Sequence, residues 1–152
     1  MNQCIGKFVV AAAMVLAVSG IARAHDDDDD TNTCNNFTLH GLYVFSASGF
    51  NIVSGVPQPK AIVELIDFHP GGTLTVPAAT VSINGAISRS TPGGTGTYTL
   101  GTDCTGTLLF GTQANPGPAY DLFVAFKGSQ IQMIQTGPGS PVFQGTAERL
   151  SR

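Results

Sequence analysis

One carboxylate in this chain alternates with large apolar residues, and this spacing could place it in an apolar environment where it could act as a catalytic or ligand-binding group. Alternate residues of a β-strand point to opposite faces, so a strand here would place Glu64 on one face with Ile62 and Ile66. If that face is buried, desolvation raises the pKa of the Glu64 carboxyl and suits it to acid/base catalysis or to anchoring a polar group of a ligand. The other face, with Val63 and Leu65, is also a plausible core face and would leave Glu64 in solvent.

Three tyrosines stand in similar surroundings, because each alternates with apolar residues in a β-rich run. A hydroxyl brought into an apolar strip can orient a mostly apolar ligand, although aromatic strand residues also simply fill cores. Glu64 is the candidate catalytic residue. The predicted ligand-binding residues are Tyr43, Glu64, Tyr98 and Tyr120.

Other catalytic and metal-binding patterns are absent from the sequence. There is no G-x-S-x-G nucleophile motif and no H-E-x-x-H zinc motif. The aspartate run 26–30 lacks the spaced oxygen ligands and the glycine turn of a calcium loop, and it is typical of a solvated tail. We therefore expect no cofactor and no metal.

The first 24 residues have the features of a secretory signal peptide. Lys7 precedes an apolar stretch over 8–20, and Ala22 and Ala24 supply the small residues of a cleavage site. The stretch is shorter than the roughly 20 residues that cross a bilayer, so we expect no membrane span in the mature protein. These features predict a secreted or periplasmic protein.

Removal of residues 1–24 would leave two cysteines, Cys34 and Cys104. An even number of cysteines in an oxidising compartment favours pairing, so we predict a disulfide between them. Such a bond would restrict the unfolded chain by roughly 4 kcal/mol. A redox or metal pair would need closer spacing or further ligands.

The composition sets the class of protein. The chain has 152 residues, of which 42% are hydrophobic and 11% are charged, with a formal net charge of -3. These values exclude wholesale disorder and offer no basic surface for nucleic acid. After the signal peptide we predict an Asp-rich disordered tail over 25–36 and a single domain over 37–152. The oligomeric state does not follow from the composition.

Short alternating runs, separated by Gly, Pro and Asn, indicate an all-β domain. Asn84 and Gly85 form a hairpin signal between two such runs, and 115–118 and 137–141 have the composition of loops. Closure of consecutive strands removes exposed edges, so we predict a small antiparallel up-and-down β-barrel of about eight to ten strands, with a β-sandwich as the alternative. The predicted strands are 39–49, 61–68, 72–76, 80–83, 86–90, 95–100, 104–110, 120–126, 130–136 and 142–150.

The stretch 96–107 (GTYTLGTDCTGT) resembles a motif of small exported bacterial proteins that are largely uncharacterised. A G-x-Y at 41–43 and a G-T-x-x-R-like ending at 145–149 are similar to the same group. The serial strands resemble, more distantly, lipocalin-like and allene-oxide-cyclase-like barrels. That resemblance implies a barrel and suggests a pocket, but it carries over no catalytic residue.

Three functions are compatible with these features. The first is an exported barrel that binds an apolar or amphipathic small molecule in its lumen. The second is an enzyme of cyclase or isomerase type in the same lumen, with Glu64 as the acid/base and a tyrosine as its polar partner. The third is a structural or surface-interaction domain with a filled core.

Overall fold

The structure is a computed structural model that describes residues 33–90, 92–137 and 141–150. The predicted signal peptide and the tail up to residue 32 lie outside the described residues, as does most of the predicted loop at 137–141. Within the described residues, no helix is long and apolar enough to cross a membrane. The elements are β1 (Gly41–Val53), β2 (Val56–His69), β3 (Thr73–Ile83), β4 (Ala86–Ser90), β5 (Gly94–Leu100), β6 (Thr105–Gly111), β7 (Pro116–Ala125), the short helix η1 (Phe126–Gly128), β8 (Gln130–Gln135) and β9 (Val142–Arg149).

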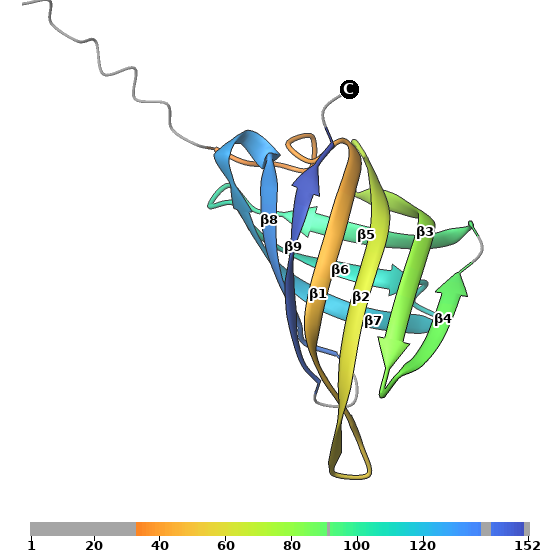
Figure 1. The fold of residues 1–152 in the computed structure, drawn as a ribbon. Helices are drawn as coiled ribbons and strands as arrows, with labels where there is room; N and C mark the ends of the chain where they lie inside the picture. The colour runs from red at the N-terminus through yellow and green to blue at the C-terminus, as the bar shows by residue number, and fades with distance from the viewer. Residues whose placement is uncertain (1–32, 91, 138–140, 151–152) are drawn as a thin grey trace, which may run out of the picture. The chain divides into compact units, whose positions relative to one another are not determined.

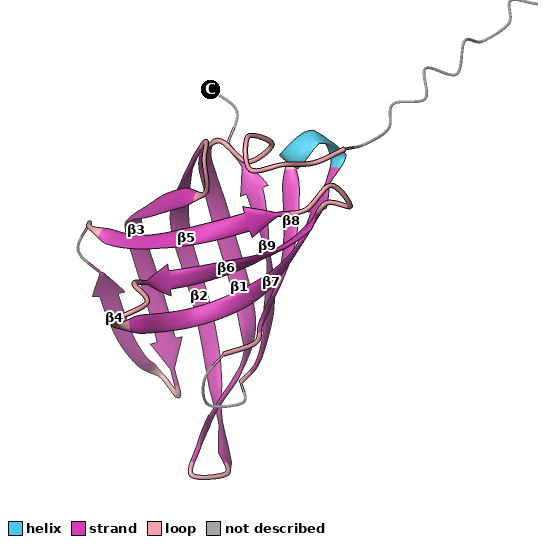
Figure 2. Ribbon diagram, turned by 180° about the vertical axis from the view of Figure 1, so that it is seen from behind, coloured by secondary structure: helices cyan, strands magenta, loops and turns pink. Residues whose placement is uncertain are grey.

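The strands form one antiparallel sheet that closes on itself, which confirms the predicted β-barrel. The sheet order is β2-β1-β9-β8-β7-β6-β5-β3-β4, and an additional pairing of β2 with β3 completes the ring. Eight strands therefore make the barrel, and β4 is an extra strand paired with β3 (Figure 1). Figure 2 shows β5, β6 and β7 as one wall, with β1, β2 and β9 behind them.

The third strand is continuous where the sequence predicted two short strands, 72–76 and 80–83. Pro77 lies within it, at a register irregularity opposite the segment between Leu65 and Asp67. Up to Val76, β3 pairs with β5, and from Ala79 it pairs with β4. A proline, which has no N–H for the ladder, is tolerated at such an irregularity. The barrel wall divides at this point, since β4 and β5 leave the same edge of β3.

Two turns differ in how well the sequence predicted them. Asn84 and Gly85 both have positive φ, 49° and 84°, as a two-residue hairpin turn requires, so that prediction is confirmed. A second such turn at Ser54 and Gly55 was not predicted, and it joins β1 and β2 into one long hairpin. The predicted loop at 115–118 is wrong, because β7 begins at Pro116.

Alternation sorts the side chains into an inward and an outward set. In β1 and β2, Tyr43, Phe45, Ile66 and Phe68 are buried, whereas Val63 is 55% exposed. Buried aromatic rings and the partly buried ring of Phe110 pack edge to face within the barrel. The pairs are Tyr43 with Phe68, Phe68 with Tyr98, Phe45 with Tyr120, and Phe110 with Tyr120.

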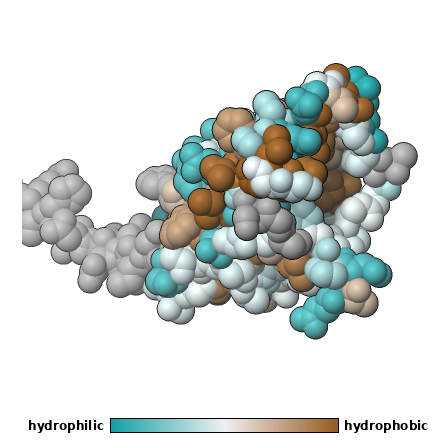
Figure 3. Space-filling model, turned by 90° about the horizontal axis from the view of Figure 1, so that it is seen from below, coloured by the Kyte–Doolittle hydropathy of each residue, from teal (hydrophilic) through white to brown (hydrophobic). Residues whose placement is uncertain are grey.

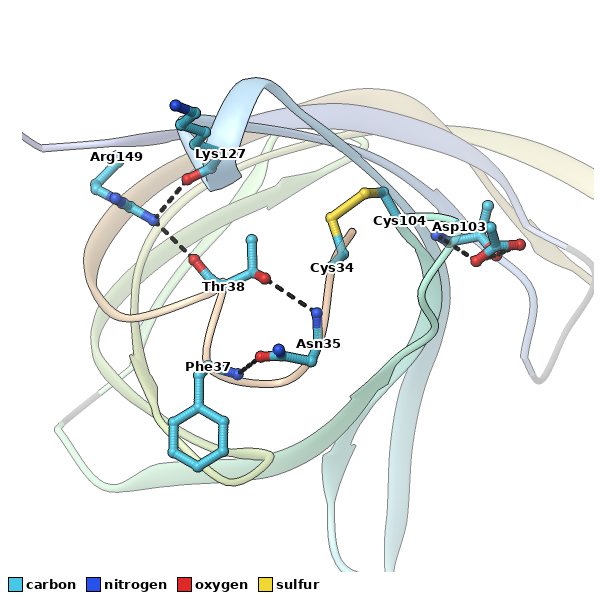
Figure 4. Close-up of a disulfide and its surroundings, with 9 residues drawn as sticks. Cys34, Asn35, Phe37, Thr38, Asp103, Cys104, Lys127 and Arg149 are labelled. Carbon is cyan, nitrogen blue, oxygen red and sulfur yellow. Dashed lines mark hydrogen bonds between the residues drawn. A yellow bond between two sulfur atoms is a disulfide. The ribbon is translucent and has the colours of Figure 1, made fainter. Parts of the chain in front are cut away.

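One end of the barrel, which we call the closed end, is covered by residues 33–40. The predicted disulfide is present and joins Cys34 in this segment to Cys104 at the end of the turn that precedes β6 (Figure 4). Asn36 accepts a hydrogen bond from the backbone of Leu100 at 2.8 Å, and Leu39 is fully buried. Residues 33–36, which the sequence assigned to the tail, are thus part of this cover.

The motif at 96–107 belongs to the closed end. Cys104 has a φ of 62°, and the Asp103 carboxylate holds the turn by accepting hydrogen bonds from the Thr105 amide and hydroxyl at 3.1 and 2.9 Å. These bonds lower the pKa of Asp103. A side chain in place of Gly106 would collide with the carbonyl oxygen of Thr99. The motif is therefore explained by local structure.

Candidate functional site

A cavity of about 390 Å³ opens at the other end of the barrel, which we call the open end. It lies where β3 changes partner, so that β4 and the ends of β5, β6 and β7 border its entrance. Hydrophobic side chains gather around a hollow when the molecule is seen from below (Figure 3). This lumenal pocket is lined by Lys60, Ile62, Glu64, Val76, Ala79, Val81, Ile83, Ser90, Gly94, Thr95, Phe110, Gly111, Pro118 and Tyr120.

Glu64 points into the barrel and lines this pocket. It lies in the middle of β2, paired with Phe45 of β1 and Ala79 of β3, and it is only 7% exposed. Its Oε1 atom is buried and has no hydrogen-bond partner within the part of the chain that the structure describes. Desolvation raises the pKa of the carboxyl to about 7, although the positive charge of Lys60 opposes the shift. At neutral pH the side chain is therefore divided between its acid and its carboxylate form.

Lys60 is the second charged residue of the lumenal pocket, and the sequence analysis missed it. Its ammonium lies 4.2 Å from the centroid of the Phe143 ring and 3.4 Å from Oε1 of Gln135. Burial lowers its pKa, while the charge of Glu64 works in the opposite direction. The signal was available in the sequence, because residues 60, 62 and 64 share one face of a strand.

Tyr120 joins Glu64 at the pocket from the opposite wall. It lies in β7, is 2% exposed, and contacts Phe45 and Phe110 edge to face. Burial raises its pKa, and the negative charge of Glu64 raises it further. The structure thus brings together two of the four residues that the sequence selected as ligand-binding.

The other two tyrosines lie at the closed end. The Tyr98 hydroxyl is 2.7 to 3.0 Å from the carbonyl oxygens of Asn36, Leu39 and His69, and burial raises its pKa to about 12. The Tyr43 hydroxyl donates to the carbonyl of Gly128 and accepts from Nε of Arg149. Neither residue lines the lumenal pocket, so neither belongs to the site proposed below.

Searches of protein-family models, of curated proteins and of solved structures find no match for this chain. The resemblance of its motif to small exported bacterial proteins, and of its barrel to lipocalin-like folds, stays a prediction. The case for function therefore depends on the geometry of the pocket itself.

Proposed function

We propose that this protein binds a small, mostly apolar molecule in the lumenal pocket. One observation carries the proposal: an open, largely apolar cavity is lined by a carboxyl group with a buried oxygen that no described group of the protein satisfies. Small-molecule sites are typically concave and apolar, with a few polar groups that fix the orientation of the ligand. A volume of about 390 Å³ is within the usual range for such sites.

The energetics of Glu64 support a role beyond folding. A buried polar group without a partner costs about 1 to 3 kcal/mol, and an apolar residue at this position would avoid that cost. Proteins often carry such a cost at binding sites, where the group is used by a ligand. Glu64 satisfies this description, since it lines the pocket and none of the described residues forms a hydrogen bond with its Oε1.

We further propose that the protein works outside the cytoplasm, in the periplasm or the medium. The disulfide between Cys34 and Cys104 supports an oxidising compartment. The signal-peptide pattern over residues 1–24 is consistent with the same location.

A fluorescence titration with Nile red, an uncharged apolar probe, tests the binding proposal. Ala79 lines the pocket, so Ala79→Trp should fill it and weaken probe binding at least about tenfold. Ala78→Trp is the matched control, because Ala78 is the neighbouring residue in β3 and points outward. Circular dichroism checks that both variants fold. We expect strong saturable binding by the wild type and by Ala78→Trp, and weakened binding by Ala79→Trp. No saturable binding by the wild type, or equal binding by all three proteins, would contradict the proposal.

A second candidate function is acid/base catalysis on a bound ligand, as in a cyclase or isomerase. It is favoured by the pKa of about 7 for Glu64, which suits both donation and acceptance of a proton near neutral pH. The test is incubation of the protein in deuterated water with an unsaturated ligand that copurifies with it. Deuterium incorporation by the wild type but not by Glu64→Gln is expected for catalysis. Deuterium incorporation at the same rate by the wild type and by Glu64→Gln would contradict acid/base catalysis by Glu64.

A further inference from the structure

We infer that the occupant of the lumenal pocket is an uncharged molecule with an apolar body and one hydroxyl or N–H group, which donates a hydrogen bond to the carboxyl group of Glu64. The inference rests on the proposed function and names the class of ligand. It is carried by two observations, the unpartnered oxygen of Glu64 and the balance of charge around it.

The first observation fixes the polar group of the ligand. The carboxyl group of Glu64 belongs to a pocket whose nearby walls are Ile62, Ala79 and Phe110, and its buried Oε1 has no hydrogen-bond partner among the described residues. A carboxylate oxygen accepts hydrogen bonds, so the complementary group is an O–H or an N–H. Hydrogen bonds to charged groups are worth more than neutral ones, because the charge is otherwise left without compensation.

The second observation fixes the charge of the ligand. Of the described residues that line the pocket, Lys60 and Glu64 alone belong to the charged types, and their charges are opposite. The two groups also interact, since each charge shifts the pKa of the other residue. When Glu64 and Lys60 are both ionised, an ammonium ligand would leave one excess positive charge in the pocket and a carboxylate ligand one excess negative charge. Only an uncharged ligand keeps the balance, and an uncompensated buried charge is costly.

Lys60 has its own contacts within the protein. Its ammonium already lies over the ring of Phe143 and within hydrogen-bond distance of Gln135 Oε1. Gln135 is itself fixed, because its Nε2 donates to the carbonyl of Gly137 at 3.0 Å. Lys60 therefore acts as a nearby counter-charge for Glu64, and the free acceptor of the pocket is on Glu64.

The groups that face Glu64 from its neighbouring elements do not alter this conclusion. In the adjacent strands its partners are Phe45 and Ala79, which carry no charge. From the opposite wall the titratable group is Tyr120, whose raised pKa keeps it neutral near pH 7. Lys60 is the remaining charged group, and it lies on the same strand.

Competition against Nile red tests the inference with ligands of matched size. Octanol and methyl heptyl ether are isomers, and only the alcohol has a donor. Octylamine and octanoate present the two charges on a similar chain. At about pH 8, where Glu64 is mostly ionised, octanol should displace the probe about tenfold better than each of the other three.

Two variants assign the preference to the residues that the inference names. Glu64→Met removes the acceptor and keeps an apolar side chain of similar length, so octanol and its isomer should compete equally. Lys60→Met removes the counter-charge, so octylamine should compete at least about tenfold better than with the wild type. Val63→Met, on the outward face of β2, is the control and should leave the wild-type order unchanged.

The outcomes separate this inference from the proposed function. Equal competition by octanol and its isomer in the wild type would overturn the inference. Competition by octylamine or octanoate as strong as that of octanol would overturn it as well. If Ala79→Trp still abolished probe binding, the proposed function would stand while the ligand class failed. Absence of any saturable probe binding would contradict both the proposed function and the inferred ligand class.

Discussion

The two ends of this barrel differ in whether their buried polar groups have hydrogen-bond partners. At the closed end the Tyr98 hydroxyl lies near three carbonyl oxygens, and Arg149 donates a hydrogen bond to the Tyr43 hydroxyl. Arg149 also donates to the carbonyls of Thr38 and Lys127 (Figure 4). At the open end Glu64 is buried, and its Oε1 has no partner among residues 33–90, 92–137 and 141–150. The closed end therefore contributes to stability, while the open end retains a group that folding alone does not require.

Loss of the disulfide should have the largest effect on the closed end. Replacement of Cys34 and Cys104 by serine frees a long loop of the unfolded chain and should lower the free energy of unfolding by about 4 kcal/mol. Urea denaturation measures this change. Nile red binding to the folded variant should persist, because the pocket lies at the other end. A loss below about 1 kcal/mol, or a folded variant that no longer binds the probe, would contradict the division between the ends.

Glu64→Gln should raise the free energy of unfolding above about pH 7, whereas loss of the disulfide lowers it. The folded state holds the proton of Glu64 up to about pH 7, whereas the unfolded state releases it near pH 4.5, so the stability of the wild type falls as pH rises between these values. At about pH 8 the variant should be more stable than the wild type by up to about 3 kcal/mol, with little difference at about pH 4. Thermal or urea unfolding across this range measures the gap. A variant that is less stable at about pH 8 would show that Glu64 contributes to stability.

A smaller effect is expected from single hydroxyls. Tyr98→Phe removes the single O–H donor that lies near three carbonyl oxygens and should cost about 2 kcal/mol of unfolding free energy. Tyr120→Phe is the matched change at the open end, where the residue borders the pocket, and should cost less than about 1 kcal/mol. Urea denaturation compares the two variants. Equal losses would remove the contrast between the ends.

The smallest effect concerns pH and ligand choice. Because a carboxylate accepts a donor better than a carboxylic acid does, the preference for octanol over methyl heptyl ether should grow as pH rises through about 7. The expected change is about threefold to tenfold between about pH 6 and about pH 8, measured by the same probe competition. A preference that is constant with pH in the wild type would be evidence against contact between the donor and Glu64.

Much of the fold could be predicted from the sequence, since alternation and turn residues act locally. The direction in which Glu64 points could not. In β2 both faces are apolar, with Ile62, Ile66 and Phe68 on one side and Val63 and Leu65 on the other, so the strand alone does not choose. The choice comes from pairing with β1, where Phe45 lies opposite Glu64 and points inward.

The site was predicted in part for a similar reason. The local sequence pattern around a tyrosine in an apolar strand is the same whether its hydroxyl bonds to a carbonyl or lines a cavity. The carbonyls that hold Tyr98 come from residues 29 to 62 positions away in the chain, and local patterns do not contain that information. The pocket lies where the pairing partner of β3 changes from β5 to β4. Its position therefore depends on how three strands pair, which no local pattern contains.

The most direct test is a titration of the Glu64 side-chain carboxyl by carbon NMR, with the free protein and with saturating octanol. The free protein should titrate at about pH 7, because the carboxyl is buried. Octanol should move the midpoint downward, because a bound donor favours the carboxylate, and methyl heptyl ether should not lower it. A midpoint near the ordinary value of 4.5 in the free protein, or one that octanol leaves unchanged, would contradict the account.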